Sequence, residues 1–77
     1  MTTTNEALRQ VDDDWRAYTH AVIALCQLAD TLDAADENDR VGIGNQLSIQ
    51  LAAVTRKRRL WLESQADLCL ATEQALF

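Results

Sequence analysis

Four consecutive basic residues, Arg56–Arg59, are the strongest candidate for a chemical role in this chain. Clustered cations bind the phosphates of nucleic acid or an acidic partner protein. Consecutive residues of a helix, however, are spaced by about 100° around its axis, so these four cannot form one flat patch. We therefore expect them to form salt bridges with Asp12–Asp14, within one chain or between two. An acidic protein partner is the next alternative, and nucleic acid is the third.

The acidic residues and the single histidine do not have the spacing of a metal or catalytic site. The carboxylates of Asp12–Asp14 diverge on a helix, so they cannot converge on one ion. The segment Asp36–Asp39 lacks the alternating ligands and the distal glutamate of a calcium loop, so we assign it to helix capping. His20 has no Ser, Cys or Asp at a diagnostic distance along the chain. We therefore predict no enzymatic activity, no cofactor and no metal.

The two cysteines, Cys26 and Cys69, are predicted to be free thiols that pack as small apolar residues. In an antiparallel hairpin they would lie about 28 Å apart at 1.5 Å per residue, too far for a disulfide. Free thiols fit a reducing, cytoplasmic location. The N-terminal residues lack the pattern of a secretory signal. We also expect no membrane association, because no stretch approaches the roughly 18 apolar residues that span a bilayer.

A seven-residue repeat of apolar side chains runs through the N-terminal half of the chain without a gap. Steps of three and four residues alternate, which is the pattern of a helix packed along other helices, as in a coiled coil. The repeat consists of Leu8, Val11, Trp15, Tyr18, Val22, Leu25, Ala29 and Leu32. Its neighbours Ala21, Cys26 and Leu28 make the apolar surface broader than a two-stranded coiled coil needs, which favours three or four helices.

The C-terminal half carries a less regular repeat. Its apolar members are Leu47, Leu51, Val54, Trp61 and Leu68, and the polar residues that interrupt it are Arg58, Gln65 and Thr72. A second apolar group points away from the first and consists of Ile49, Leu60, Leu70 and Phe77. Because a hairpin has only one inner face, this second group predicts another packing surface, in preference to scattered exposed apolar side chains.

These patterns predict an all-α fold in which two long antiparallel helices form an αα-hairpin, a single domain over residues 1–77. The stretch that breaks periodicity contains Gly42 and Gly44, the only glycines in a chain without proline. We expect residues 1–4 to be disordered and the first helix to run over about 5–35, capped by Thr4 or Asn5.

The start of the second helix is less well determined. With a turn over about 36–44, Asn45 would cap a helix of about 45–76. Alternatively, a side chain of the segment Asp36–Asp39 caps a helix that starts near residue 39. We favour this earlier start because it makes the two arms similar in length.

The charge of the chain is unevenly distributed. The net charge is −5, but residues 1–39 hold nine acidic and two basic side chains, whereas residues 40–77 hold three acidic and five basic ones. Halves of opposite sign favour packing on each other, in one chain or between chains. The overall acidity argues against nonspecific attraction to nucleic acid or to an anionic membrane.

A chain of 77 residues needs a supplement to its core, because a domain this small buries only about 60% of its unfolded surface. With no disulfide or metal pattern, self-association is the expected supplement. We predict that the hairpin dimerises into a four-helix bundle. The predicted dimer or partner interface comprises Trp15, Tyr18, Val22, Leu25, Ile49, Arg58, Leu60, Trp61, Leu68 and Leu70.

The expected function is that of a small non-enzymatic protein–protein interaction module. Such a homodimer would act as a regulator, inhibitor, adaptor or chaperone that docks on a larger protein through an apolar helical face. The alternative is a nucleic-acid-binding helical dimer that uses residues 56–59. The net charge of −5 and the absence of a recognition-helix turn disfavour it.

Overall fold

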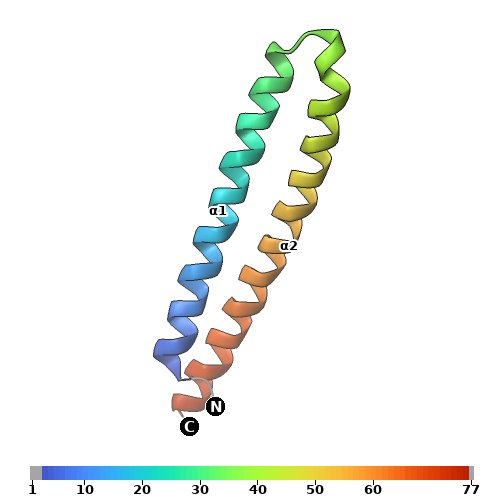
Figure 1. Cartoon of the computed structure of the whole chain (residues 1–77). Coiled ribbons are helices and arrows are strands. Elements are labelled where there is room, and N and C mark those ends of the chain that lie inside the picture. The colour runs from blue at the N-terminus through green and yellow to red at the C-terminus, as the bar shows by residue number, and fades with distance from the viewer. Residues whose placement is uncertain (1–2, 77) are drawn as a thin grey trace.

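The computed structural model describes residues 3–76 and shows two helices that lie side by side in an antiparallel hairpin (Figure 1). Helix α1 spans Thr4–Ala34 and helix α2 spans Glu37–Leu76. The hairpin is a narrow rod of 60 × 14 × 13 Å. The predicted all-α fold with two antiparallel helices is confirmed.

Helix α1 begins with a reciprocal capping box. The Thr3 hydroxyl accepts a hydrogen bond from the Glu6 backbone N–H at 3.2 Å, and the Glu6 carboxylate accepts one from the Thr3 N–H at 3.4 Å. Each bond satisfies a backbone donor that has no partner within the helix. The N-cap is therefore Thr3, and neither Thr4 nor Asn5 caps the helix as predicted. The prediction of disorder over residues 1–4 is wrong for Thr3 and Thr4, and its first two residues lie outside the described residues.

The connection between the helices is shorter than predicted. Only residues 35 and 36 separate them, so the predicted turn over 36–44 and the later helix start at 45 are wrong. The earlier start was close, since α2 begins at Glu37. Acidic residues in this first turn interact favourably with the positive end of the helix dipole. Both glycines lie inside α2 with negative φ, where each costs only about 1 kcal/mol relative to alanine.

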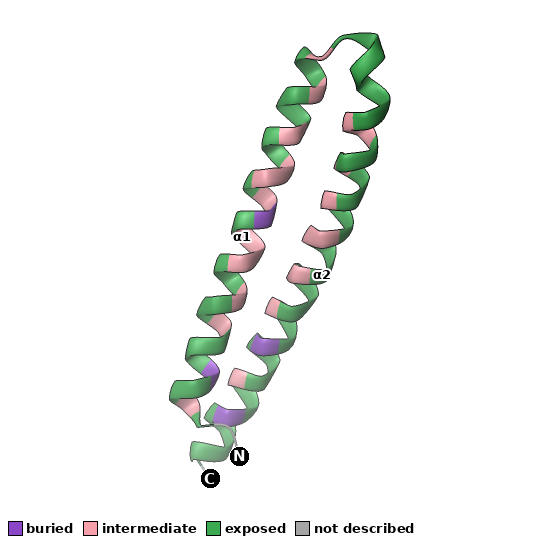
Figure 2. Ribbon diagram, in the orientation of Figure 1, coloured by how far each residue is buried: buried purple, intermediate pink, exposed green. Residues whose placement is uncertain are grey.

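A row of buried and half-buried residues on each helix faces the other helix (Figure 2). On α1 this inner row consists of Ala7, Val11, Asp14, Tyr18, Ala21, Leu25, Leu28 and Leu32. On α2 it consists of Ile43, Leu47, Gln50, Val54, Lys57, Trp61, Ser64, Leu68 and Ala71. Both rows advance by alternating steps of three and four residues, as the coiled-coil geometry requires.

Every second member of the predicted repeats lies elsewhere. Leu8 and Trp15 are 51% and 45% exposed, and the inner row instead contains the residues one position earlier, Ala7 and Asp14. The same shift on α2 exposes Leu51 and Arg58. Within the inner rows, the Gln50 side-chain amide donates a 3.0 Å hydrogen bond to the Ala21 carbonyl on α1.

The hairpin has little core of its own. Within residues 3–76 the buried residues are Ala7, Ala21, Ser64 and Ala71, and no large side chain is fully buried. Cys26 and Cys69 are free but exposed, so their predicted packing inside the hairpin is wrong. Because burial of large apolar side chains is the main stabilising contribution to folding, the hairpin interface alone supplies little of it.

Candidate interaction surface

An aromatic cluster joins the two helices near the middle of the rod. The ring of Trp15 on α1 lies 4.8 Å from that of Trp61 on α2, and Tyr18 lies 5.9 Å from Trp15 and 5.7 Å from Trp61, all between ring centroids. Tyr18 and Trp61 are half-buried between the helices, whereas Trp15 covers the cluster from outside. The cluster therefore reaches the surface on the side where Trp15 lies.

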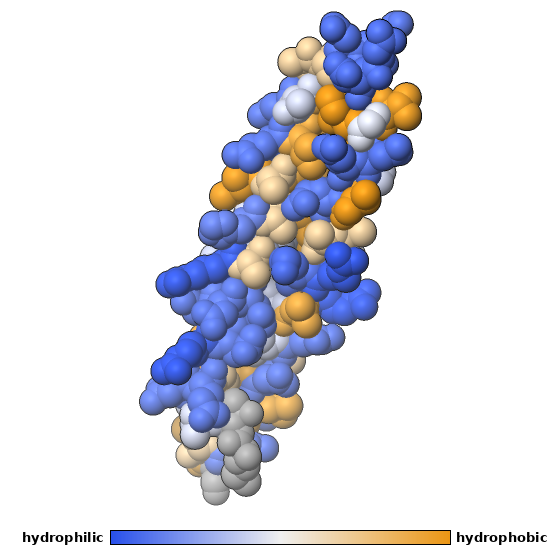
Figure 3. Space-filling view, in the orientation of Figure 1, coloured by the Kyte–Doolittle hydropathy of each residue, from blue (hydrophilic) through white to orange (hydrophobic). Residues whose placement is uncertain are grey.

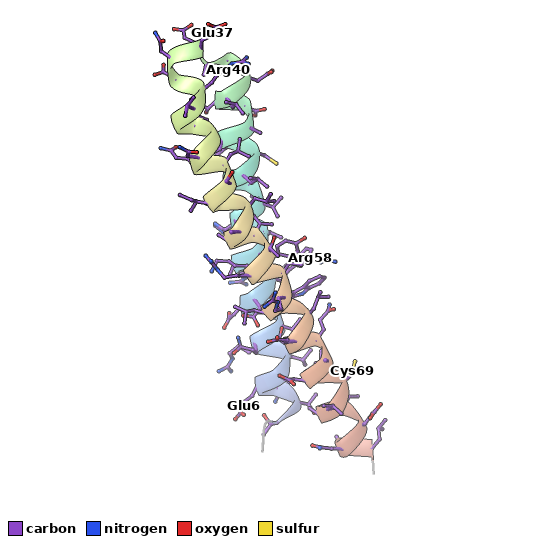
Figure 4. The ribbon with its side chains drawn as sticks, turned by 90° about the vertical axis from the view of Figure 1, so that its right-hand side faces the viewer. Glu6, Glu37, Arg40, Arg58 and Cys69 are labelled. Atoms are coloured by element: carbon purple, nitrogen blue, oxygen red, sulfur yellow. The ribbon has the colours of Figure 1, made fainter. Side chains whose placement is uncertain are left out.

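That side of the hairpin is called the Trp15 face. It is formed by the residue that comes directly after every second member of each inner row. Consecutive residues of a helix are about 100° apart around its axis, so these residues lie beside the inner rows. These residues are Leu8, Trp15, Val22 and Ala29 on α1, and Leu51, Arg58, Gln65 and Thr72 on α2. In antiparallel right-handed helices these positions lie on the same side. Figure 4 shows Arg58 and Cys69 toward this side of α2 and Glu6 toward the other.

The Trp15 face exposes most of the large apolar side chains of the hairpin. Leu8, Trp15 and Leu51 belong to it, and Val41, Leu62 and Leu76, all exposed, lie along its outer edge on α2. Exposed apolar side chains that gather on one side of a protein make that side a candidate interaction surface.

The opposite face is more polar. On this face, the rows that lie next to the inner rows consist of Gln10, Ala17, Ala24 and Thr31 on α1, and Gln46, Ala53, Leu60 and Asp67 on α2. Its large exposed apolar residues are Leu60, Ile49 and Leu70, all from α2. In Figure 3, which looks onto this face, hydrophobic side chains form a band along the middle of the upper half and separate spots among hydrophilic ones in the lower half.

An open pocket of about 460 Å³ lies on the opposite face near the N-terminus of α1. Its lining includes the carboxylates of Glu6 and Asp67, the amide of Gln10 and the hydroxyl of Ser64. The Ser64 hydroxyl donates a 2.8 Å hydrogen bond to the Trp61 carbonyl, so it is held as part of the helix.

The predicted interface residues fall into three groups. Tyr18, Leu25, Trp61 and Leu68 are half-buried in the hairpin itself; Trp15, Val22 and Arg58 lie on the Trp15 face; Ile49, Leu60 and Leu70 lie on the opposite face. The prediction omitted Leu8 and Leu51, although both occupy the same position of the seven-residue repeat as Trp15. That shared position is the signal that identifies them.

The basic segment does not pair with acidic residues of its own chain. Arg56, Arg58 and Arg59 are exposed and Lys57 is half-buried. Over residues 3–76 the only salt bridge joins Arg16 to Asp12, at 3.1 Å. The predicted salt bridges from Arg56–Arg59 to Asp12–Asp14 within one chain are therefore wrong, and pairing between two chains stays a prediction.

The part of the chain that the structure describes contains no cluster of three His, Cys, Asp or Glu side chains placed to hold a metal ion. His20 is exposed. Neither α1 nor α2 contains an apolar stretch long enough to cross a membrane within residues 3–76. No protein-family model, curated protein or solved structure significantly matches this chain.

Proposed function

We propose that this chain is a non-enzymatic protein–protein interaction module that forms a homodimeric four-helix bundle and docks on a larger protein. The observation that carries the proposal is the imbalance between core and surface. Within residues 3–76 no large side chain is fully buried, while ten large apolar side chains are exposed. Association with another protein surface would remove these side chains from water.

The exposed area agrees with this proposal. The chain exposes 5947 Å², whereas a folded monomer of 8.6 kDa exposes about 4,700 Å². The difference, about 1,250 Å², lies within the roughly 1,000–2,500 Å² that one subunit of an obligate homodimer buries. A dimer would therefore give this chain the buried area of an ordinary small protein.

Sedimentation equilibrium of the purified chain tests self-association. We expect twice the chain mass of 8.6 kDa at micromolar concentration, with helicity lost as dilution dissociates the dimer. A chain that is monomeric at 100 µM and still unfolds cooperatively would overturn the proposed homodimer.

Docking on a larger protein has a separate test. The substitution Ile49→Asp changes an exposed side chain of the opposite face and is expected to leave helicity and dimer mass unchanged. In affinity capture from the native cell, proteins that bind the wild-type chain directly should be lost from Ile49→Asp. Equal capture by both chains would contradict docking through that face.

A nucleic-acid-binding dimer is the second candidate, supported by the three exposed arginines without a salt bridge in the described hairpin. These arginines point in different directions around the helix, so they form no single patch, and the net charge of the chain is −5. Both facts argue against nucleic-acid binding. Titration with random duplex DNA decides between the two, since phosphate contacts weaken steeply with salt. Absence of binding at low salt would remove this candidate.

A further inference from the structure

We propose that a second copy of this chain covers the Trp15 face, with the two-fold axis of the dimer parallel to the helices. In this arrangement α1 of one copy packs antiparallel against α2 of the other. The inference rests on the proposed homodimer and adds to it the face, the orientation and the helix pairing.

The direction of the apolar repeats supports this face. On α1 the residues Val11, Tyr18 and Leu25 face α2, and Leu8, Trp15 and Val22 lie on the Trp15 face. Taken together, the apolar stripe of α1 therefore points midway between the direction of α2 and the outward direction of the Trp15 face. In a square four-helix bundle each helix directs its apolar stripe between its two neighbours, toward the bundle axis.

Helix α2 shows the same division more weakly. Leu47, Val54, Trp61 and Leu68 belong to its inner row, and Leu51 is the apolar member of its repeat that lies on the Trp15 face, beside Arg58, Gln65 and Thr72. Both stripes thus point to one side of the hairpin, where no helix of this chain lies. Two further helices placed there would complete the bundle, and a second copy supplies two.

The polarity of the opposite face supports the same choice. The rows of that face that lie next to the inner rows contain Gln10, Gln46 and Asp67. A dimer interface on that face would have to remove these polar side chains from water. The corresponding rows of the Trp15 face hold Leu8, Trp15, Val22 and Ala29 on α1, and on α2 they hold Leu51 beside Arg58, Gln65 and Thr72. The advantage of the Trp15 face therefore comes from its α1 row, which is apolar and contains a tryptophan. Stable interfaces have few charged residues at their centre and are enriched in aromatic ones.

Charge decides how the two copies are oriented. Helix α1 holds six acidic and two basic residues, a net charge of −4, whereas α2 holds five of each. A dimer that packed α1 on α1 would bring the two acidic helices together. With the two-fold axis parallel to the helices, each α1 instead meets the neutral α2 of the second copy.

The same arrangement brings opposite charges to one level. The contact between Trp15 and Trp61 fixes the register of the hairpin, and the axis parallel to the helices transfers that register to the second copy. Asp12 of one copy then lies near the level of Arg58 of the other. Arg58, which lies on the Trp15 face and has no salt bridge within the described hairpin, would find an acidic partner across the dimer.

Disulfide cross-linking tests the helix pairing. Thr19 and Thr55 lie at one level, because the contacts Trp15–Trp61 and Ala21–Gln50 bracket them. Within one chain both point outward from helices whose axes lie roughly 8–10 Å apart, beyond the Cβ separation of about 4 Å in a disulfide. Across the proposed interface they face each other. The background carries Cys26→Ser and Cys69→Ser, which change exposed residues.

In that background, Thr19→Cys with Thr55→Cys should give mostly covalent dimer under mild oxidation, read on a non-reducing gel. Each single variant should stay uncross-linked, and an equimolar mixture of the two should again give covalent dimer. Circular dichroism of the reduced variants checks that they fold.

Three results would overturn the inference in different ways. Cross-linking of either single variant would show that a helix packs on its own copy. A dimeric mass without cross-linking of the double variant would place the interface on another face and leave the proposed homodimer intact. A monomeric mass for the reduced wild-type chain would refute the homodimer itself.

Discussion

Leu51 and Leu60 form a matched pair that separates the Trp15 face from its opposite. Both are leucines of α2, they are 53% and 51% exposed, and they lie on the Trp15 face and the opposite face respectively. Substitution of either by alanine leaves helix propensity almost unchanged, because leucine and alanine are both strong helix formers. A difference between Leu51→Ala and Leu60→Ala therefore reports on what covers each side chain in the assembly.

The size of the effect follows from the exposed fraction of Leu51. Full burial of a leucine side chain contributes about 1.5–3 kcal/mol. The 53% that the hairpin leaves exposed is then worth roughly 0.8–1.6 kcal/mol when a second copy covers it. Since the two-fold axis repeats the contact, Leu51→Ala should weaken the dimer by roughly 1.6–3.2 kcal/mol, a rise in Kd of roughly 15- to 200-fold.

Sedimentation velocity over a dilution series measures the dissociation constants of the wild type and the two variants. We expect the rise for Leu51→Ala and a change of less than about threefold for Leu60→Ala, which is a surface substitution if the opposite face stays uncovered. Equal effects of the two substitutions, or a larger effect of Leu60→Ala, would refute the assignment of the dimer interface to the Trp15 face.

Three further predictions concern the hairpin itself. Leu25→Asp places a charge in the half-buried inner row and should cost about 3 kcal/mol or more, abolishing folding or assembly; unchanged circular dichroism and mass would contradict the assigned face. Thr3→Ala removes the capping box and should lower the free energy of unfolding by about 1 kcal/mol in urea titration, whereas Thr3→Ser should retain it. Gly42→Ala and Gly44→Ala meet no atom within 4 Å of the new methyl group, so each should raise the unfolding temperature through a gain of about 0.5–1 kcal/mol.

The helices and their antiparallel pairing could be predicted because the periodic apolar residues of the N-terminal half leave little choice of element. The ends were predicted less well, and the sequence held a signal for one of them. Thr3 followed by Glu6 three residues later matches the capping-box pattern. The short connection had no such signal, because the two glycines indicated a longer turn. In the structure both continue the helix.

The inner row of α2 could not be predicted from hydrophobicity. Gln50, Lys57 and Ser64 occupy it, and an apolar pattern assigns such residues to the surface. The Gln50 amide finds a carbonyl acceptor on α1, a hydrogen bond that forms only once the two backbones are placed together. The Ser64 hydroxyl instead bonds to the Trp61 carbonyl of its own helix.

The mismatch between the apolar repeats and the inner rows is itself an argument about assembly. A hairpin that functioned alone would bury more apolar surface if α1 turned by about 50°, bringing Leu8 and Trp15 inward in place of Ala7 and Asp14. The same turn of α2 would exchange Gln50 for Leu51 but Lys57 for Arg58. The structure instead keeps half of each repeat outside. In the proposed dimer each helix would have two neighbours, one in its own chain and one in the second copy, and each neighbour would receive part of the apolar stripe. The polar members of the inner rows, such as Asp14 and Lys57, would then result from sharing the apolar residues between two interfaces.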